Sequence, residues 1–169
     1  MAVCELLIAA GADLEAINAV DATPLGVAAA GKPQLGLCQA LLAVVANANT
    51  AGSATGRTAL HFAATSGAGV TCALLLEAGA WDAGGTAVGQ YRDAPLHLAA
   101  RFGDVTSCRT LIAAGAPVDA LDVEGTTPLH AAAAEADLHR ACGRRRVAAS
   151  RGERRAAPKR HVEAGSIGV

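Results

Sequence analysis

The chain has 169 residues, of which 52% are hydrophobic and 17% are charged, enough apolar material for the core of one globular unit. Residues 1–139 hold five lysines and arginines against thirteen acidic residues, whereas residues 140–169 hold nine against two, so an acidic body precedes a basic tail. The N-terminus lacks the basic segment of a secretory signal, and the longest smooth apolar stretch, residues 37–48, is too short to span a bilayer. We therefore expect a soluble cytoplasmic protein, with the nucleus as the alternative.

The cysteines mark a regular period along the chain. They stand 34, 34, 36 and 34 residues apart, at Cys4, Cys38, Cys72, Cys108 and Cys142. Aliphatic residues follow three and four places after each of the first four, at Leu7/Ile8, Leu41/Leu42, Leu75/Leu76 and Leu111/Ile112. This spacing predicts four equivalent helices that each bury one face. Seven places after the cysteine stands a glycine suited to a left-handed C-cap, except in the second helix, where Val45 takes that position.

A shorter helix is predicted before each complete cysteine helix. Its first turn contains a proline at Pro24, Pro95 and Pro128, where a missing N–H costs nothing. A threonine suited to N-capping stands just before that turn at Thr23, Thr58 and Thr127. Each unit of about 34 residues therefore consists of a polar turn, a first helix, a short break, a second helix and a glycine stop.

These units resemble ankyrin repeats, whose unit is of similar length and carries a T-P-L-H-x-A signature. The signature is complete at residues 127–132 and altered at 58–61 and 94–97; at 23–26 a glycine, Gly26, replaces the histidine. The resemblance covers roughly residues 3–142 and implies an all-α solenoid of stacked helix–turn–helix units joined by turn or hairpin loops. It also implies that His61, His97 and His130 brace the turns, a brace that the second unit would lack.

The predicted domain organisation is a repeat region over residues 1–139 and a tail. A partial first unit spans residues 1–18, further units span about 19–52, 53–88 and 89–121, and a degenerate last unit runs from 122 to 142. In the last unit Arg145 and Arg146 replace the inward aliphatic pair, so we expect its second helix not to dock. The tail, 143–169, is basic and without apolar periodicity, and we predict that it is disordered. The abrupt start and end suggest a fragment or a frame-shifted gene model.

No pattern of residues predicts a cofactor, a metal site or catalysis. Equivalent cysteines on stacked helices lie about 8–10 Å apart, too far for a disulfide, and we interpret each as a small buried hydrophobe. Repeated histidines are better explained by structure than by one active site. The glycine-rich loop at residues 84–89 lacks the lysine of a phosphate-binding loop. We expect no enzyme, no cofactor and no small-molecule substrate.

Candidate contact residues are those at the turn tips and the exposed side of the first helices, the surface through which the resemblance implies partner binding. The set that we favour is Arg57, Ser66, Trp81, Tyr91, Asp93, Arg101, Phe102 and Glu124. Tyrosine, arginine and phenylalanine dominate binding hot spots, and the fourth unit has all three. For Trp81 and Phe102, covering a seam between units is an equal alternative.

The function that these features favour is a non-catalytic scaffold or adaptor module, monomeric, that binds a protein partner through the concave face of the repeats. The alternative is a recruitment fragment of a larger multidomain protein such as a ubiquitin-ligase adaptor, a kinase or a channel. Nucleic-acid or membrane contact through the basic tail is a weaker hypothesis, because no aromatic residues stand among its arginines to stack on bases.

Overall fold

The computed structural model describes residues 2–31, 34–44, 46–81 and 92–134, which belong to one compact unit, Met1–Glu135. Within these residues every regular element is a helix, which confirms the predicted all-α fold. The helices are α1 (Ala2–Ala9), α2 (Pro24–Ala30), α3 (Leu35–Ala43), α4 (Ala59–Thr65), α5 (Gly69–Glu77), α6 (Pro95–Arg101) and α7 (Val105–Ala113). Residues 128–134 are helical as well.

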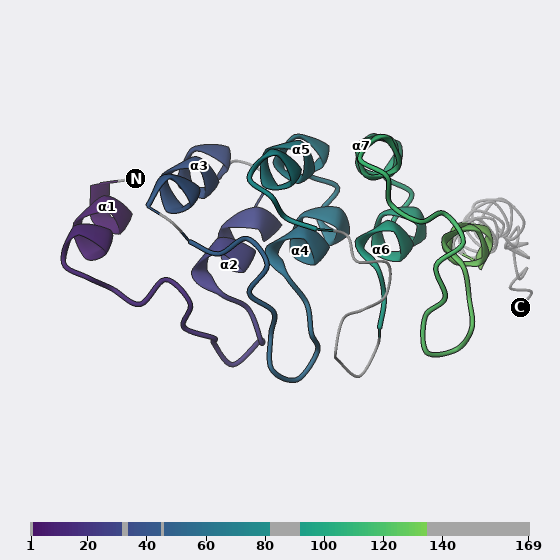
Figure 1. The fold of residues 1–169 in the computed structure, drawn as a ribbon, viewed down its shortest axis with the longest axis horizontal. Coiled ribbons are helices and arrows are strands. Elements are labelled where there is room, and N and C mark those ends of the chain that lie inside the picture. Colours follow the sequence, from purple (N-terminus) through teal and green to yellow (C-terminus); the bar gives the residue numbers. More distant parts are fainter. Residues whose placement is uncertain (1, 32–33, 45, 82–91, 135–169) are drawn as a thin grey trace, which may run out of the picture. The chain divides into compact units, whose positions relative to one another are not determined.

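The helices form two layers, with the loops between units projecting from one side (Figure 1). The shorter helices α2, α4 and α6 pack on one another in one layer, and α3, α5 and α7 form the other. Each short helix also packs on the longer helix that follows it in the chain. This is the stacking of helix pairs that the 34-residue period predicted.

Helices α1, α5 and α7 end at glycines as predicted. Gly11, Gly79 and Gly115 have φ values of 83°, 85° and 91°, in the left-handed region that costs other residues energy. At the end of α5 the N–H of Ala80 donates to the carbonyl of Leu75, and the N–H of Gly79 to that of Leu76. These bonds form a Schellman motif, which satisfies carbonyls that the helix leaves open.

The short helices begin at the predicted caps. The hydroxyl of Thr23 accepts a hydrogen bond from the N–H of Gly26, and Pro24 and Pro95 occupy the first turns of α2 and α6. Gly26, which replaces the expected histidine, lies close to the next short helix: a Cβ there would be 3.1 Å from Cδ2 of Phe62. The missing side chain thus leaves room for the ring of Phe62.

The core is built from small residues and leucines, including Ala29, Ala63 and Ala99, which are 0% exposed, and Leu60 and Leu75. One expectation about it was wrong. Both members of each aliphatic pair were expected to be buried, but Leu111 is 0% exposed while Ile112 is 49% exposed, and Leu7 in α1 is 56% exposed. The longer helices form an outer layer, so only the narrow strip that faces the short helices is covered.

The cysteines on the longer helices also differ in burial. Cys38 and Cys72 are buried, whereas Cys4 and Cys108 are only half-buried, so the prediction that each is a buried hydrophobe holds for two of these four. All four are free thiols. Burial raises the pKa of Cys72 to about 11, and its Sγ lies 3.7 Å from Oγ of Ser107 in the next long helix. This thiol is a packing group with little thiolate at neutral pH.

The predictions for Val45, the loop at 84–89, Cys142 with Arg145 and Arg146, and the tail at 143–169 lie outside the described residues. The predicted unit boundaries remain predictions.

Candidate protein-interaction surface

The predicted contact residues differ widely in exposure. Trp81 and Phe102 are exposed at 69% and 57%, Glu124 is exposed, and Ser66, Arg57 and Arg101 are partly exposed. Asp93 is buried at 6% exposed, unlike the tip position at which the repeat register placed it. Tyr91 lies outside the described residues. Most of the surface of each of these two aromatic residues is open to solvent.

Two arginines from different parts of the stack form ion pairs with buried Asp93. Nη2 of Arg57, which precedes α4, lies 3.8 Å from Oδ2 of Asp93, and Nη1 of Arg101, the last residue of α6, lies 3.7 Å from the same oxygen. The structure thus brings together three of the predicted residues. We name Arg57, Asp93 and Arg101 the arginine cluster.

A buried histidine fixes the cluster to the preceding unit. Nε2 of His61 donates a hydrogen bond of 2.9 Å to the carbonyl of Asp93, and Nδ1 accepts one of 3.1 Å from the N–H of Thr58. This pattern requires the neutral ring with its proton on Nε2. Burial, together with the charge of Arg57, lowers the pKa of His61 to about 4, although the bond to Asp93 opposes that shift. The ring therefore stays neutral at physiological pH.

The next unit repeats this brace. Nδ1 of His97 accepts a bond of 3.1 Å from the N–H of Ala94, and Nε2 lies 3.0 Å from the carbonyl of Thr126. Each histidine thus caps its own helix and holds the loop of the following unit. This confirms the turn-bracing role that the resemblance implied for His61 and His97.

In the second unit, where the histidine is missing, an aspartate that the sequence analysis overlooked makes the connection. The carboxylate of Asp21 accepts hydrogen bonds from the N–H of Thr55 at 2.6 Å, the hydroxyl of Thr55 at 2.7 Å and the N–H of Ala54 at 3.2 Å. The bond from the Thr55 hydroxyl, with that from its N–H, lowers the pKa of Asp21 to about 2. A positive φ of 61° at Asp21, tolerated better by aspartate than by most residues, accompanies this arrangement. An aspartate at a turn position is the sequence signal from which this connection could have been predicted.

Trp81 is held by its backbone and not by its ring. Its N–H donates a 2.9 Å hydrogen bond to Oδ1 of Asn49, and Nδ2 of Asn49 donates to the carbonyl of Gly79. The structure records no direct bond between Trp81 and the arginine cluster among the described residues. The indole is therefore an exposed apolar group on an anchored backbone.

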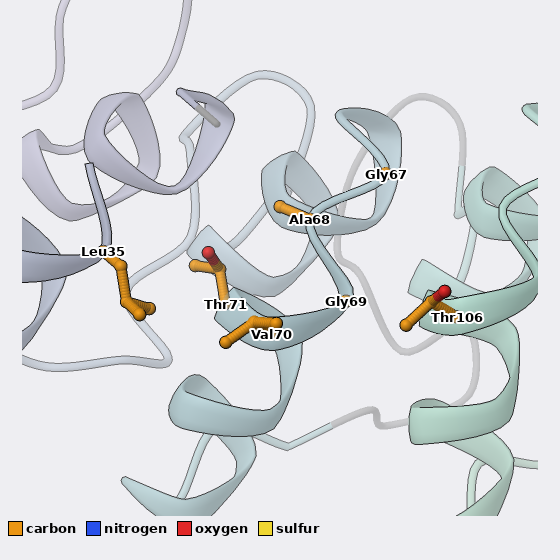
Figure 2. Close-up of a pocket in the computed structure, with 7 residues that line it drawn as sticks. All are labelled: Leu35, Gly67, Ala68, Gly69, Val70, Thr71 and Thr106. Atoms are coloured by element: carbon orange, nitrogen blue, oxygen red, sulfur yellow. The ribbon is translucent and has the colours of Figure 1, made fainter. Parts of the chain in front are cut away.

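The described residues also contain hollows, of which one is shown in Figure 2. A pocket of about 390 Å³ lies where α5 begins, lined by Leu35, Val70, Thr71 and Thr106 together with residues 67–69. None of its lining residues is titratable or a nucleophilic cysteine. Within the described part of the chain no group of three or more His, Cys, Asp or Glu is placed to hold a metal ion, and no helix has both the length and the apolarity to cross a bilayer.

Comparison with known proteins agrees with the repeat geometry. Residues 1–86, just over half of the chain, match a family model described as ankyrin repeats (3 copies), and residues 96–147 match one described as ankyrin repeats (many copies). A curated relative, the human neurogenic locus notch homolog protein 4, is 52% identical over 50 residues, which are 30% of this chain and 2% of that protein. Ankyrin repeats are generally protein-interaction modules and typically non-catalytic. With its stacked helix pairs, glycine stops and histidine braces, the chain belongs to the ankyrin repeat family.

Proposed function

We propose that the chain is a non-catalytic interaction module that binds a protein partner through its first-helix face. We define that face as the loop tips together with the exposed sides of α2, α4 and α6. The observation that carries the proposal is Phe102, a 57% exposed aromatic residue at the C-cap of α6, directly after the arginine cluster. Aromatic residues, including phenylalanine, and arginine are enriched at protein interfaces relative to the rest of the surface.

The scaffold under this surface is rigid enough to present it. Loops of successive units are tied by the side chains of Asp21, His61 and His97. A preordered surface loses less conformational entropy on binding than a mobile one. The side chains of Asp21, His61 and His97 are themselves engaged in these structural hydrogen bonds.

Site-directed photo-crosslinking tests this proposal. A benzoylphenylalanine would replace Phe102 in one chain and Val118, which is 51% exposed beyond the end of α7, in another. Both chains would be irradiated in cell extract and their adducts identified by mass spectrometry. We expect a discrete protein adduct at position 102 and none at 118. Equal, heterogeneous labelling at both positions would contradict the proposal.

A second candidate is that these repeats recruit partners for a larger multidomain protein, such as a ubiquitin-ligase adaptor, a kinase or a channel. The observation that favours it is the relative, because the matched segment is only 2% of that much longer protein. Intact-mass measurement of the endogenous protein tests it. A mass well above the 16.7 kDa of this chain would support the second candidate, and a mass equal to it would exclude it.

A further inference from the structure

We propose that copies of this chain associate head to tail, with the short helix at residues 128–134 of one copy packing on α1 of the next. These two helices lie at opposite ends of the row of helices (Figure 1). Joined, they would form a helix pair of the kind that α2 and α3 form within one copy. The contacts lie at the ends of the stack, so this goes beyond the proposed function. A self-associating chain also differs from the monomer that we expected from the sequence.

At the N-terminal end of the stack, α1 exposes the strip that a short helix covers in the other units. Helices α3, α5 and α7 each pack on the short helix that precedes them. The central leucine of the strip is at most 4% exposed in those three helices, at Leu41, Leu75 and Leu111. Leu7, at the same position of α1, is 56% exposed. Val3 and Leu6 share its side of the helix and are exposed too, so the described residues leave this apolar face open to solvent.

At the C-terminal end, residues 128–134 expose the strip that neighbouring helices cover in the other units. The leucine of the T-P-L-H signature is at most 3% exposed at Leu25, Leu60 and Leu96. Leu129, at the same position, is 78% exposed. Ile112 of the adjacent α7 is 49% exposed, whereas its equivalents in α3 and α5 pack against the core. Each end therefore exposes apolar positions that every internal unit buries.

The two ends complement each other in the way that successive units do. Docking of residues 128–134 on α1 would cover Leu7 and Leu129 together, and would place α1 beside α7 as α5 lies beside α7 in one copy. Val27 of α2 is 48% exposed, whereas Leu98 at the equivalent position of α6, which packs on α4, is 1% exposed. A docked short helix would cover Val27 in the same way.

A hollow beside α1 gives an apolar side chain room to enter. It has a volume of about 170 Å³ and lies between α1, α2 and α3, lined among others by Leu7, Leu14, Pro24 and Leu41. Solenoids normally end in units with a polar outer face, and a contiguous exposed apolar patch marks an interaction site. These ends therefore favour association over exposure to water.

Charge supports the same arrangement. Equivalent positions of the long helices form a row along the stack, and the row directly after the cysteines holds Glu5, Gln39, Ala73 and Arg109. Glu5 and Arg109 are exposed and stand at opposite ends of this row. Packed helices lie about 8–10 Å apart, so a head-to-tail joint would bring Glu5 of one copy next to Arg109 of another. A symmetric joint between two α1 helices would instead place two glutamates at one interface, where like charges repel.

Sedimentation equilibrium of the full chain over a wide range of concentrations tests the proposal. A head-to-tail joint leaves one free end of each kind on every complex, so association continues beyond the dimer. We expect the weight-average mass to rise with concentration from 16.7 kDa and to pass twice that value. A mass that stays at 16.7 kDa, or that levels off at a dimer, would overturn the proposal.

Two variants that each block one end make the test specific. Leu7→Glu and Leu129→Glu should each be monomeric alone, because every copy then carries the same blocked end. An equimolar mixture should form a one-to-one dimer and nothing larger, because one unaltered end of each variant meets the other and the remaining ends are blocked. Val70→Glu, which places the same charge on a 65% exposed valine of the internal helix α5, should associate as the wild type does. Self-association of Leu129→Glu alone, or a monomeric mixture, would overturn the proposal.

Folding and the basic tail are controlled separately. Each variant must match the wild-type urea unfolding curve by circular dichroism; Val3→Glu replaces Leu7→Glu if that variant fails, and Leu129→Gln replaces Leu129→Glu. Attraction between the tail and the acidic body would weaken steeply with salt, whereas an apolar joint persists. Association that is lost at high salt and retained in both blocked variants would assign it to the tail and reject the joint. A specific crosslink at position 102 in a monomeric chain would retain the proposed function and reject only self-association.

Discussion

Acidification should destabilise the repeats through protonation of His61. The neutral ring accepts the Thr58 N–H at Nδ1 and donates to Asp93 at Nε2. Protonation adds a hydrogen to Nδ1, so that Nδ1 can no longer accept the N–H of Thr58 and two N–H groups face each other. It also charges a ring that is 5% exposed. Both changes are unfavourable in the folded state and cost little in the unfolded one.

The size of the effect follows from the pKa of His61, which folding lowers from the ordinary 6.5 to about 4. Because the unfolded chain then binds more protons than the folded chain between these values, stability falls as the pH falls through this window. The stability that neutral His61 provides is fully present above about pH 7 and mostly lost at pH 4. At about 1.36 kcal/mol per pKa unit, the loss by pH 4.5 is about 2 to 3 kcal/mol.

Urea unfolding monitored by circular dichroism at pH 7.5, 6.5, 5.5 and 4.5 measures this loss. The comparison variant is His61→Gln, whose amide can still accept and donate but does not titrate. His130→Gln, an exposed histidine at the same repeat position, is the matched control. We expect wild type and His130→Gln to lose about 2 to 3 kcal/mol more than His61→Gln between pH 7.5 and 4.5. Equal losses in all three chains would refute the reasoning.

Three further predictions concern packing, the loop tie and the thiols. Gly69→Ala should destabilise the fold by about 1–3 kcal/mol in urea unfolding, because the new Cβ would lie 2.5 Å from Cγ2 of Thr106. Asp21→Asn should lower the urea midpoint at pH 7, since the hydrogen bonds from Thr55 lose their charged acceptor; in the wild-type chain this contribution is present above about pH 4 and is lost as the pH falls towards the lowered pKa of about 2. Cys72 should resist iodoacetamide at pH 8 in the folded chain, because burial raises its pKa to about 11.

Each of these three predictions has a matched control. Thr106→Ser removes the methyl group that the alanine meets, so it should recover part of the stability that Gly69→Ala loses; no recovery would locate the strain elsewhere. Asp119→Asn, at an exposed aspartate, should leave the midpoint unchanged, and a drop equal to that of Asp21→Asn would indicate a general charge effect. Half-buried Cys108 should react before Cys72, as read by peptide mass spectrometry, and the reverse order would contradict the burial.

Much of the fold could be predicted because its signals are local and repeat. A glycine seven places after a cysteine predicts a helix stop from the conformation that glycine alone adopts cheaply, and Gly79 has that conformation. A threonine or proline at the first turn of a short helix acts through neighbouring backbone groups, as Thr23 does. A period of about 34 residues then requires such pairs to stack, because one pair cannot bury its own apolar face.

The candidate site was harder to predict from the sequence, because it depends on which side chains of different units meet. The repeat register placed Arg57, Asp93 and Arg101 on one surface, but it could not indicate that Asp93 is buried and forms ion pairs with the other two. Nor did it indicate that Asp21 replaces the missing histidine brace, since its partners stand more than thirty residues later. The sequence by itself determined the helices, their ends and the repeat family, because those depend on contacts within one unit. Only the tertiary structure decided exposure and charge pairing, because these depend on distances between units that no local pattern encodes.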